Sequence, residues 1–159
     1  MEKMTIYTDG CCLQNPSGPG GYGVVILDGA EPVRKLSCGY RKTTNNRMEL
    51  MAFFDALMEC PPEREIDFYT DSKYAIGVLS GSMNPTKNLD LVDDIRELLR
   101  KRKCTFTWVK GHNGDKYNEE CNKLATLAAR SPFLFVDSGF EEELEPSTMD
   151  LEEYLRAIG

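Results

Sequence analysis

Two segments of the chain end in almost the same way, and this repetition limits the folds that the chain can adopt. Residues 4–10 read Met-Thr-Ile-Tyr-Thr-Asp-Gly, and residues 66–72 read Ile-Asp-Phe-Tyr-Thr-Asp-Ser. Both are runs of apolar, β-branched and aromatic residues typical of buried strands, and both end at an aspartate, Asp9 and Asp71. If the strands are parallel neighbours, their carboxylates meet at one sheet edge, where repulsion favours a shared proton or a bound cation.

The rest of the pattern predicts an α/β fold with one mixed sheet. Further strands are expected over residues 24–27, 33–40 and 104–109, and helices over residues 45–60, from Ser72 onward, and over 89–99 and 117–130. Short connections predict that the first three strands form an antiparallel meander. The order β-β-β-α-β-α-α-β-α predicts five strands with helices on both faces, and a site at the carboxyl ends of the parallel strands.

A glycine-rich stretch raises a competing interpretation. Residues 11–23 are dense in turn formers and are expected to form a loop. Gly18, Gly20 and Gly23 match the spacing G-x-G-x-x-G, but a dinucleotide-binding motif must open a helix. Here the glycines precede the β-branched run of residues 24–27, so a nucleotide-binding sheet of that type is disfavoured.

Charge divides the chain into two parts. The formal net charge is −7 over 159 residues, and all of it lies in residues 131–159, while residues 1–130 are neutral. We therefore expect one domain over 1–130 and an acidic extension over 131–159. If several carboxylates of the neutral body bind metal, the rest of the body is effectively basic, so binding to a polyanion is not excluded. Ser147 and Asp150 have the spacing of a helix start, and a short amphipathic helix is expected from there to Ile158. It could dock on a protein partner or on the body, or stay solvated.

The six cysteines contain no Cys-x-x-Cys pair and sit within the predicted strands and helices. They are expected to be buried free thiols in a reducing compartment. The amino terminus has no signal-peptide pattern, and no apolar run reaches the roughly 20 residues of a membrane span. These features lead us to expect a cytoplasmic monomer with no membrane partner.

Glu49 is the third acidic residue of interest. It shares one face of the predicted helix over residues 45–60 with Ala52, Phe53 and Ala56, so a carboxylate heads an apolar stripe. Asn46 and Glu49 also have capping-box spacing, which leaves open that Glu49 only closes the helix start. In the predicted topology Glu49 converges with Asp9 and Asp71. Three oxygen ligands of this kind favour Mg²⁺ or Mn²⁺ over zinc.

Several motifs in this order resemble those of one known family, the type 1 ribonucleases H, which cut the RNA strand of RNA–DNA hybrids with two Mg²⁺ ions. The similar stretches are residues 8–10 (Thr-Asp-Gly), 43–50 (Thr-Thr-Asn-Asn-Arg-Met-Glu-Leu), 69–72 (Tyr-Thr-Asp-Ser), 88–91 (Asn-Leu-Asp-Leu), 108–112 (Trp-Val-Lys-Gly-His) and 118–119 (Asn-Glu). They span residues 4 to about 130, and the resemblance implies the ribonuclease H-like fold for that part of the chain.

The resemblance also implies residue roles. Asp9, Glu49 and Asp71 match metal ligands, and Asn122 stands at the position of a fourth catalytic aspartate. His112 matches a mobile histidine thought to help protonate the leaving group or eject product, although a turn residue in His-Asn-Gly is the alternative. The residues that match substrate contacts are Cys12, Asn15 and Asn45 for the minor groove of the RNA strand, and Thr44 and Asn88 for a phosphate of the DNA strand.

Three features depart from the family pattern. A short loop over residues 79–87 replaces the basic, tryptophan-rich handle of some members, Lys73 stands where glutamine is usual, and Asn122 replaces the fourth aspartate. We therefore expect a Mg²⁺-dependent endonuclease on RNA–DNA hybrids, with Mn²⁺ as a substitute ion and with cleavage weakened by Asn122. A hybrid-binding module without cleavage and a nucleotide-binding or regulatory domain on the same sheet remain the alternatives.

Overall fold

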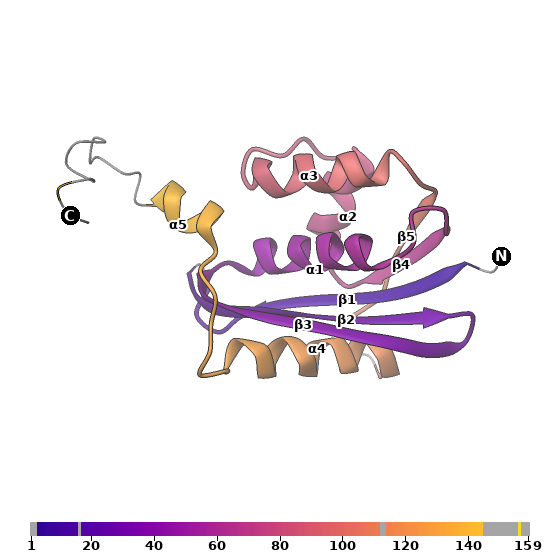
Figure 1. Cartoon of the computed structure of the whole chain (residues 1–159), viewed down its shortest axis with the longest axis horizontal. Coiled ribbons are helices and arrows are strands. Elements are labelled where there is room, and N and C mark those ends of the chain that lie inside the picture. Colours follow the sequence, from indigo (N-terminus) through magenta and orange to yellow (C-terminus); the bar gives the residue numbers. More distant parts are fainter. Residues whose placement is uncertain (1–2, 16, 112–113, 145–155, 157–159) are drawn as a thin grey trace.

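The computed structural model describes residues 3–15, 17–111, 114–144 and 156, and shows one α/β unit around a single sheet (Figure 1). The strands are β1 (Met4–Cys12), β2 (Gly18–Asp28), β3 (Glu31–Thr43), β4 (Ile66–Thr70) and β5 (Cys104–Trp108). The helices are α1 (Asn45–Glu59), α2 (Lys73–Ser80), α3 (Leu89–Leu99), α4 (Lys116–Ala129) and α5 (Ser138–Leu144).

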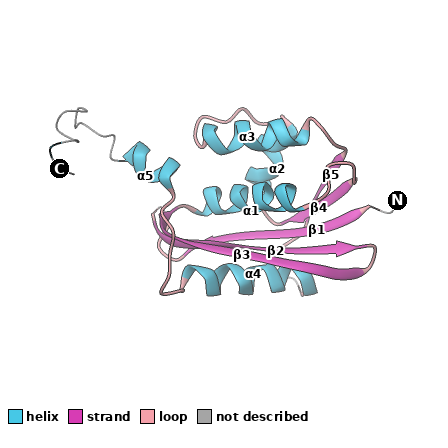
Figure 2. Ribbon diagram, in the orientation of Figure 1, coloured by secondary structure: helices cyan, strands magenta, loops and turns pink. Residues whose placement is uncertain are grey.

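The sheet order is β3-β2-β1-β4-β5. The pairs β1–β2 and β2–β3 are antiparallel, whereas β1–β4 and β4–β5 are parallel. Helix α1 packs on one face of the sheet with α3 on its outer side, and α4 covers the other face, as Figure 2 shows. The predicted mixed sheet, the antiparallel meander and the parallel neighbours β1 and β4 are therefore confirmed. The α5 helix was not predicted.

The main core lies between the sheet and α1. Ile6, Phe53 and Phe68 are fully buried there, and the Phe53 and Phe68 rings lie 4.8 Å apart between centroids. This explains why the α1 sequence is apolar nearly all round, because α1 has the sheet on one side and α3 on the other. The helix that carries Glu49 is thus held firmly against β1.

The predicted loop over residues 11–23 is wrong for most of its length. The β1 strand continues to Cys12 and pairs with Gly20, and β2 already begins at Gly18. The glycines serve close packing instead of turns: a Cβ on Gly21 would lie 2.6 Å from the carbonyl oxygen of Ala125, and one on Gly23 would clash with that of Cys121. The glycines let α4 approach the backbone of β2 directly.

The segment after α4 runs back across the edge strand. Phe135 accepts a hydrogen bond from the Arg41 N–H at 2.9 Å and donates one to Gly39 at 3.0 Å. Glu141 of α5 then forms an ion pair with Arg41. The segment from Phe135 to Glu141 therefore packs on the body, and the division at residue 130 stays a prediction. The expected helix over residues 147–158 lies outside the described residues except for Arg156.

The six cysteines are free, as expected, but only Cys60 and Cys121 are fully buried. The other four are half-buried, so the expectation of buried thiols is too general. No helix within the described ranges is long and apolar enough to cross a membrane.

Candidate functional site

The parallel pairing of β1 with β4 brings Asp9 and Asp71 together. Thr8 and Thr70 form the last parallel pair of the two strands, so each aspartate is the next residue of its chain segment. Asp9 does not end its strand as predicted, because β1 runs on three residues beyond it along β2. Asp9 lies instead just past the end of β4, where β1 still pairs with β2 but no longer with β4.

Glu49 reaches the same place from α1 because Gly10 lets the helix come close. A Cβ on Gly10 would lie 2.5 Å from the backbone nitrogen of Glu49, so any other residue at position 10 would push α1 away from β1. The capping alternative for Glu49 is wrong. The N-cap is Thr44, whose hydroxyl oxygen accepts from the backbone N–H of Arg47 at 3.1 Å.

The three carboxylates form a compact cluster. One oxygen from each of Asp9, Glu49 and Asp71 lies within 4.8 Å of the others, and Asp9 and Glu49 are only 3% and 8% exposed. Burial, and next the charge of Asp71, raise the pKa of Asp9 to about 7. Burial, and next the charges of Asp9 and Asp71, raise the pKa of Glu49 well above its usual value. Without a cation, the three carboxylates therefore repel one another.

A divalent cation fits this cluster. The buried Oε2 of Glu49 has no hydrogen-bond partner among the described residues, which is costly for a carboxylate unless something else binds it. The donors are all oxygens, as hard cations such as Mg²⁺ and Mn²⁺ require. Asp9, Glu49 and Asp71 can therefore hold such an ion.

Asn122 of α4 lies beside the cluster. Its Nδ2 donates to Oδ2 of Asp9 at 2.9 Å, and this bond, with one from the N–H of Gly10, lowers the pKa of Asp9 against the larger effect of burial. The amide thus contributes a donor where a carboxylate would contribute a further negative charge.

The raised pKa of Asp9 predicts an unusual pH dependence for the metal-free protein. The folded pKa of about 7 exceeds the usual aspartate pKa of 3.8, so the folded state holds the proton more tightly and stability falls as pH rises between these values. Asp9→Asn should therefore stabilise the metal-free chain by about 2–4 kcal/mol at pH 8, and by less at pH 5.

Urea unfolding of both proteins in chelator at the two pH values measures this difference. Excess Mg²⁺ is the matched condition, because an ion bound to the wild-type cluster should remove or reverse the advantage of Asp9→Asn. If Asp9→Asn stabilises the protein equally at both pH values, the gain does not come from removing the charge of Asp9.

The other edge of the cluster is formed by the end of β5. The Trp108 indole N–H donates to the carbonyl oxygen of Asp71 at 3.1 Å, and the ammonium of Lys73 lies 4.7 Å from the Trp108 ring centroid. Gly111 also lies against Asp71, since a Cβ there would be 2.7 Å from its Oδ2. The predicted catalytic residue His112 lies outside the described residues.

The five predicted substrate contacts lie around the start of α1. Asn15 accepts a hydrogen bond from the backbone N–H of Asn45 at 3.5 Å, which joins two of them. The Cys12 thiol donates to the carbonyl oxygens of Thr43 and Gly18. Thr44 caps α1, and Asn88 precedes α3. Their substrate roles stay predictions.

A buried ion-pair network beside these residues was missed. Arg47 is 1% exposed and lies between Asp90 of α3 and Asp137 from the segment before α5. Arg47 and Asp90 stand within motifs that carry the resemblance, but nothing in their spacing marks them as partners. Asp137 follows a run of apolar residues in what looked like an acidic extension.

The sheet order and the acidic cluster define an α/β protein of the ribonuclease H-like fold. The family model for RNase H matches residues 1–130. Among curated proteins, the chain is 41% identical over 153 residues to ribonuclease HI of Synechocystis sp., covering 87% of this chain and 95% of that protein. The chain belongs to the RNase H family.

Solved structures agree with the fold. RNase H1 from the halophilic archaeon Halobacterium salinarum NRC-1 superposes with a TM-score of 0.70 at 24% identity, covering 80% of this chain and 97% of that one. LC11-RNase H1 in complex with an RNA/DNA hybrid gives 0.68 at 23% identity, with coverages of 80% and 96%. At these identities the two structures show a shared fold.

Proposed function

We propose that this chain is a divalent-metal-dependent endonuclease that hydrolyses the RNA strand of RNA–DNA hybrids, and that Asn122 weakens its cleavage. The observation that carries the proposal is the convergence of Asp9, Glu49 and Asp71 at one buried cluster with an unpartnered Glu49 oxygen. Membership of the RNase H family and the 41% identity to a ribonuclease HI support the reaction and the substrate. We assign the nuclease to residues 1–130.

The proposed cofactor is a pair of Mg²⁺ ions, for which Mn²⁺ could substitute. Asp9, Glu49 and Asp71 would hold it, with Asn122 beside Asp9. Bound divalent ions supply Lewis-acid stabilisation of the attacking water and of the departing 3′-oxygen. His112 is proposed to help protonate that oxygen or eject product.

The proposed substrate contacts are short side chains around the start of α1. Asn15, Asn45 and Cys12 would meet the RNA strand, where amide groups can hydrogen-bond the 2′-hydroxyls that distinguish RNA from DNA. Thr44 and Asn88 would hold a phosphate of the DNA strand and so position the hybrid without reading its sequence.

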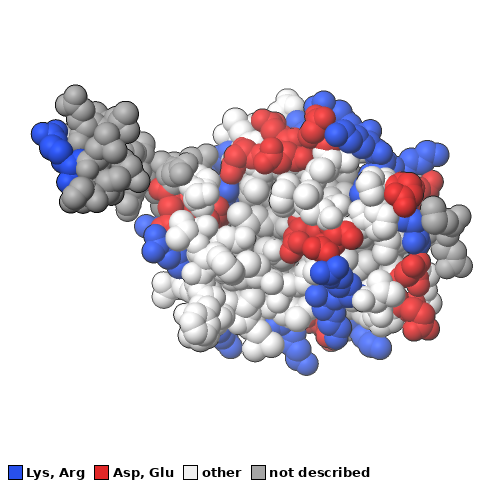
Figure 3. Space-filling model, viewed as in Figure 1, with Lys and Arg blue, Asp and Glu red and all other residues white. Residues whose placement is uncertain are grey.

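Charge limits where a hybrid can lie. Figure 3 shows acidic side chains gathered along α3 on the face turned to the viewer, and exposed acids of that helix include Asp93, Asp94 and Glu97. A polyanion is repelled there. This argues against a path across the outer face of α3, whereas a cation bound by Asp9, Glu49 and Asp71 would offset the negative charge of the acidic cluster.

A hybrid-binding module without cleavage is the second candidate, and one observation favours it. The Asn122 amide donates to an Asp9 oxygen that would otherwise be available to a cation. In this alternative the cluster is stabilised by the amide and the site holds a hybrid uncut.

The test uses end-labelled hybrid, duplex DNA and duplex RNA, each incubated with the protein in Mg²⁺ and in chelator. We expect preferential binding of the hybrid and slow cleavage of its RNA strand that stops in chelator. Binding without any cleavage favours the second candidate. Equal binding of all three duplexes would contradict both.

A further inference from the structure

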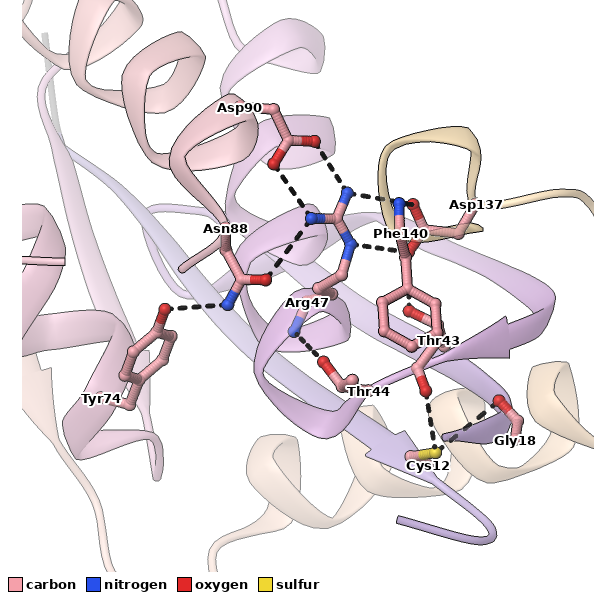
Figure 4. A network of polar contacts seen from close by, with 10 residues as sticks. All are labelled: Cys12, Gly18, Thr43, Thr44, Arg47, Tyr74, Asn88, Asp90, Asp137 and Phe140. Carbon is pink, nitrogen blue, oxygen red and sulfur yellow. Dashed lines mark hydrogen bonds and ion pairs between the residues drawn. The ribbon is translucent and has the colours of Figure 1, made fainter. Parts of the chain in front are cut away.

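The guanidinium of Arg47 uses all of its hydrogen-bond donors inside the protein (Figure 4). Its Nε donates to Asp137 at 2.8 Å and its Nη2 donates to Asp137 at 3.0 Å and to Asp90 at 2.8 Å. Its Nη1 donates to Asp90 at 3.0 Å and to Oδ1 of Asn88 at 3.4 Å. These bonds account for every N–H of an arginine side chain, so Arg47 has none left for a ligand and its plane is fixed by two carboxylates.

Arg47 in turn fixes the orientation of the Asn88 amide. A guanidinium only donates, so Asn88 must turn its oxygen toward Arg47 and its nitrogen away. One Nδ2 proton then goes to the hydroxyl of Tyr74 at 2.9 Å. The second Nδ2 proton has no hydrogen-bond acceptor among the described residues, so Asn88 has one N–H donor available for a ligand.

The backbone of Asn88 is also in an uncommon conformation. Its φ of 59° lies in the left-handed region, and its side chain makes no cap bond to α3 although it occupies the N-cap position. Asparagine is among the few non-glycine residues that adopt this region readily. Its side chain bonds to Arg47 and Tyr74 instead of to the backbone of α3.

Asp137 connects this arrangement to the segment after α4. It is 1% exposed, and besides Arg47 it accepts from the hydroxyl of Thr43 at 2.7 Å, next to the α1 cap Thr44. Without Asp137 two donors of Arg47 would lose their acceptor, and the guanidinium could rotate toward Asp90 alone. The amide of Asn88 would then lose the group that sets its orientation.

We propose that Arg47 and Asp137 are positioning residues for substrate binding, which turn an N–H of Asn88 toward a phosphate of the hybrid. The inference rests on the proposed function, because it takes the hybrid as the ligand. It gives the segment after α4 a part in substrate binding, although its own acidic groups would repel a nucleic acid. Arg47 itself does not touch the substrate.

The test is a double-variant cycle on hybrid affinity, with a labelled RNA–DNA hybrid in chelator and fluorescence anisotropy as the readout. Asn88→Ala should weaken binding about tenfold, as expected for a lost hydrogen bond to a charged group. Asp137→Asn should weaken it by a similar factor. If Asp137 acts through Asn88, the double variant should bind no more weakly than Asn88→Ala alone.

Asp28→Asn is the matched control. It makes the same chemical change in another aspartate that pairs with an arginine, Arg64, at the far end of β2, and should leave hybrid affinity unchanged. Asp90→Asn is the second variant if Asp137→Asn fails to fold. The Asp90 side chain is 43% exposed, so this substitution should be tolerated, and it removes the other carboxylate that holds the Arg47 guanidinium. Circular dichroism at the assay temperature establishes that each protein is folded.

Two results would overturn the inference while leaving the proposed function intact. One is additive loss in the double variant, about a hundredfold in total, which would mean that Asp137 acts independently of Asn88. The other is wild-type affinity in both folded Asp137→Asn and Asp90→Asn. Failure of the unaltered protein to prefer hybrid over duplex DNA would instead overturn the proposed function, and with it this inference.

Discussion

Replacing Asn122 by aspartate is expected to raise the rate of hybrid cleavage by about 10²-fold or more, because in the proposed two-ion mechanism a fourth carboxylate would help to hold the ions that stabilise the attacking and the departing oxygen. Asn122 already lies 2.9 Å from an oxygen of Asp9, so Asn122→Asp places a fourth carboxylate at the cluster without a change of shape. Single-turnover cleavage of a labelled hybrid in Mg²⁺ measures the difference. Hybrid affinity in chelator should change little.

A second readout of the same variant does not depend on activity. In chelator, Asn122→Asp removes a donor from Asp9 and adds repulsion, so the variant should unfold at a lower temperature than the unaltered protein. Mg²⁺ should then stabilise the variant more than it stabilises the unaltered protein. Equal cleavage rates and equal Mg²⁺ stabilisation would show that the residue at position 122 has no part in the metal site.

The second large effect is expected at Arg47. Arg47→Met should lower the free energy of unfolding by about 3–5 kcal/mol, because it leaves Asp137 as a buried carboxylate without its cation. Thr43 and the N–H of Phe140 would be its remaining partners. Urea denaturation at neutral pH measures the loss.

A compensating variant separates charge from packing. In Arg47→Met combined with Asp137→Leu, the network leaves no buried carboxylate without its cation, and most of the lost stability should return. Arg41→Met is the control, since its ion pair with Glu141 involves an arginine that is 59% exposed and should be worth at most about 1 kcal/mol. If Arg47→Met lowers the free energy of unfolding by less than about 1 kcal/mol, the Arg47–Asp137 pair is not the buried ion pair described here.

The parts of the fold that could be predicted are those set by local pattern. The two strands that carry Asp9 and precede Asp71, and the apolar helix with Glu49, are visible in the sequence, and short connections predict the antiparallel meander, although β1 runs on to Cys12 instead of ending at Asp9. Their convergence follows from topology, because parallel neighbours end at one sheet edge. For this reason the acidic cluster could be located before its geometry was known.

The parts that could not be predicted depend on contacts between distant segments. Gly21 and Gly23 look like turn residues in isolation, and only the approach of α4 explains why β2 needs them. The pairing of Arg47 with Asp137 joins residues that lie far apart in the chain, and no spacing rule connects them. Asn122 was placed by resemblance, whereas its hydrogen bond to Asp9 depends on how α4 lies across the sheet.

The central claim is that Asp9, Glu49 and Asp71 hold the metal that cuts the RNA strand of a hybrid. Its most direct test compares the chain carrying Asn122→Asp with the same chain carrying Glu49→Gln as well, on a hybrid labelled on both strands, in Mg²⁺. We predict that the first protein cuts only the RNA strand, and that the second is slower by about 10²-fold or more although it still binds. Equal rates for the two proteins, or cleavage of the DNA strand, would contradict the claim.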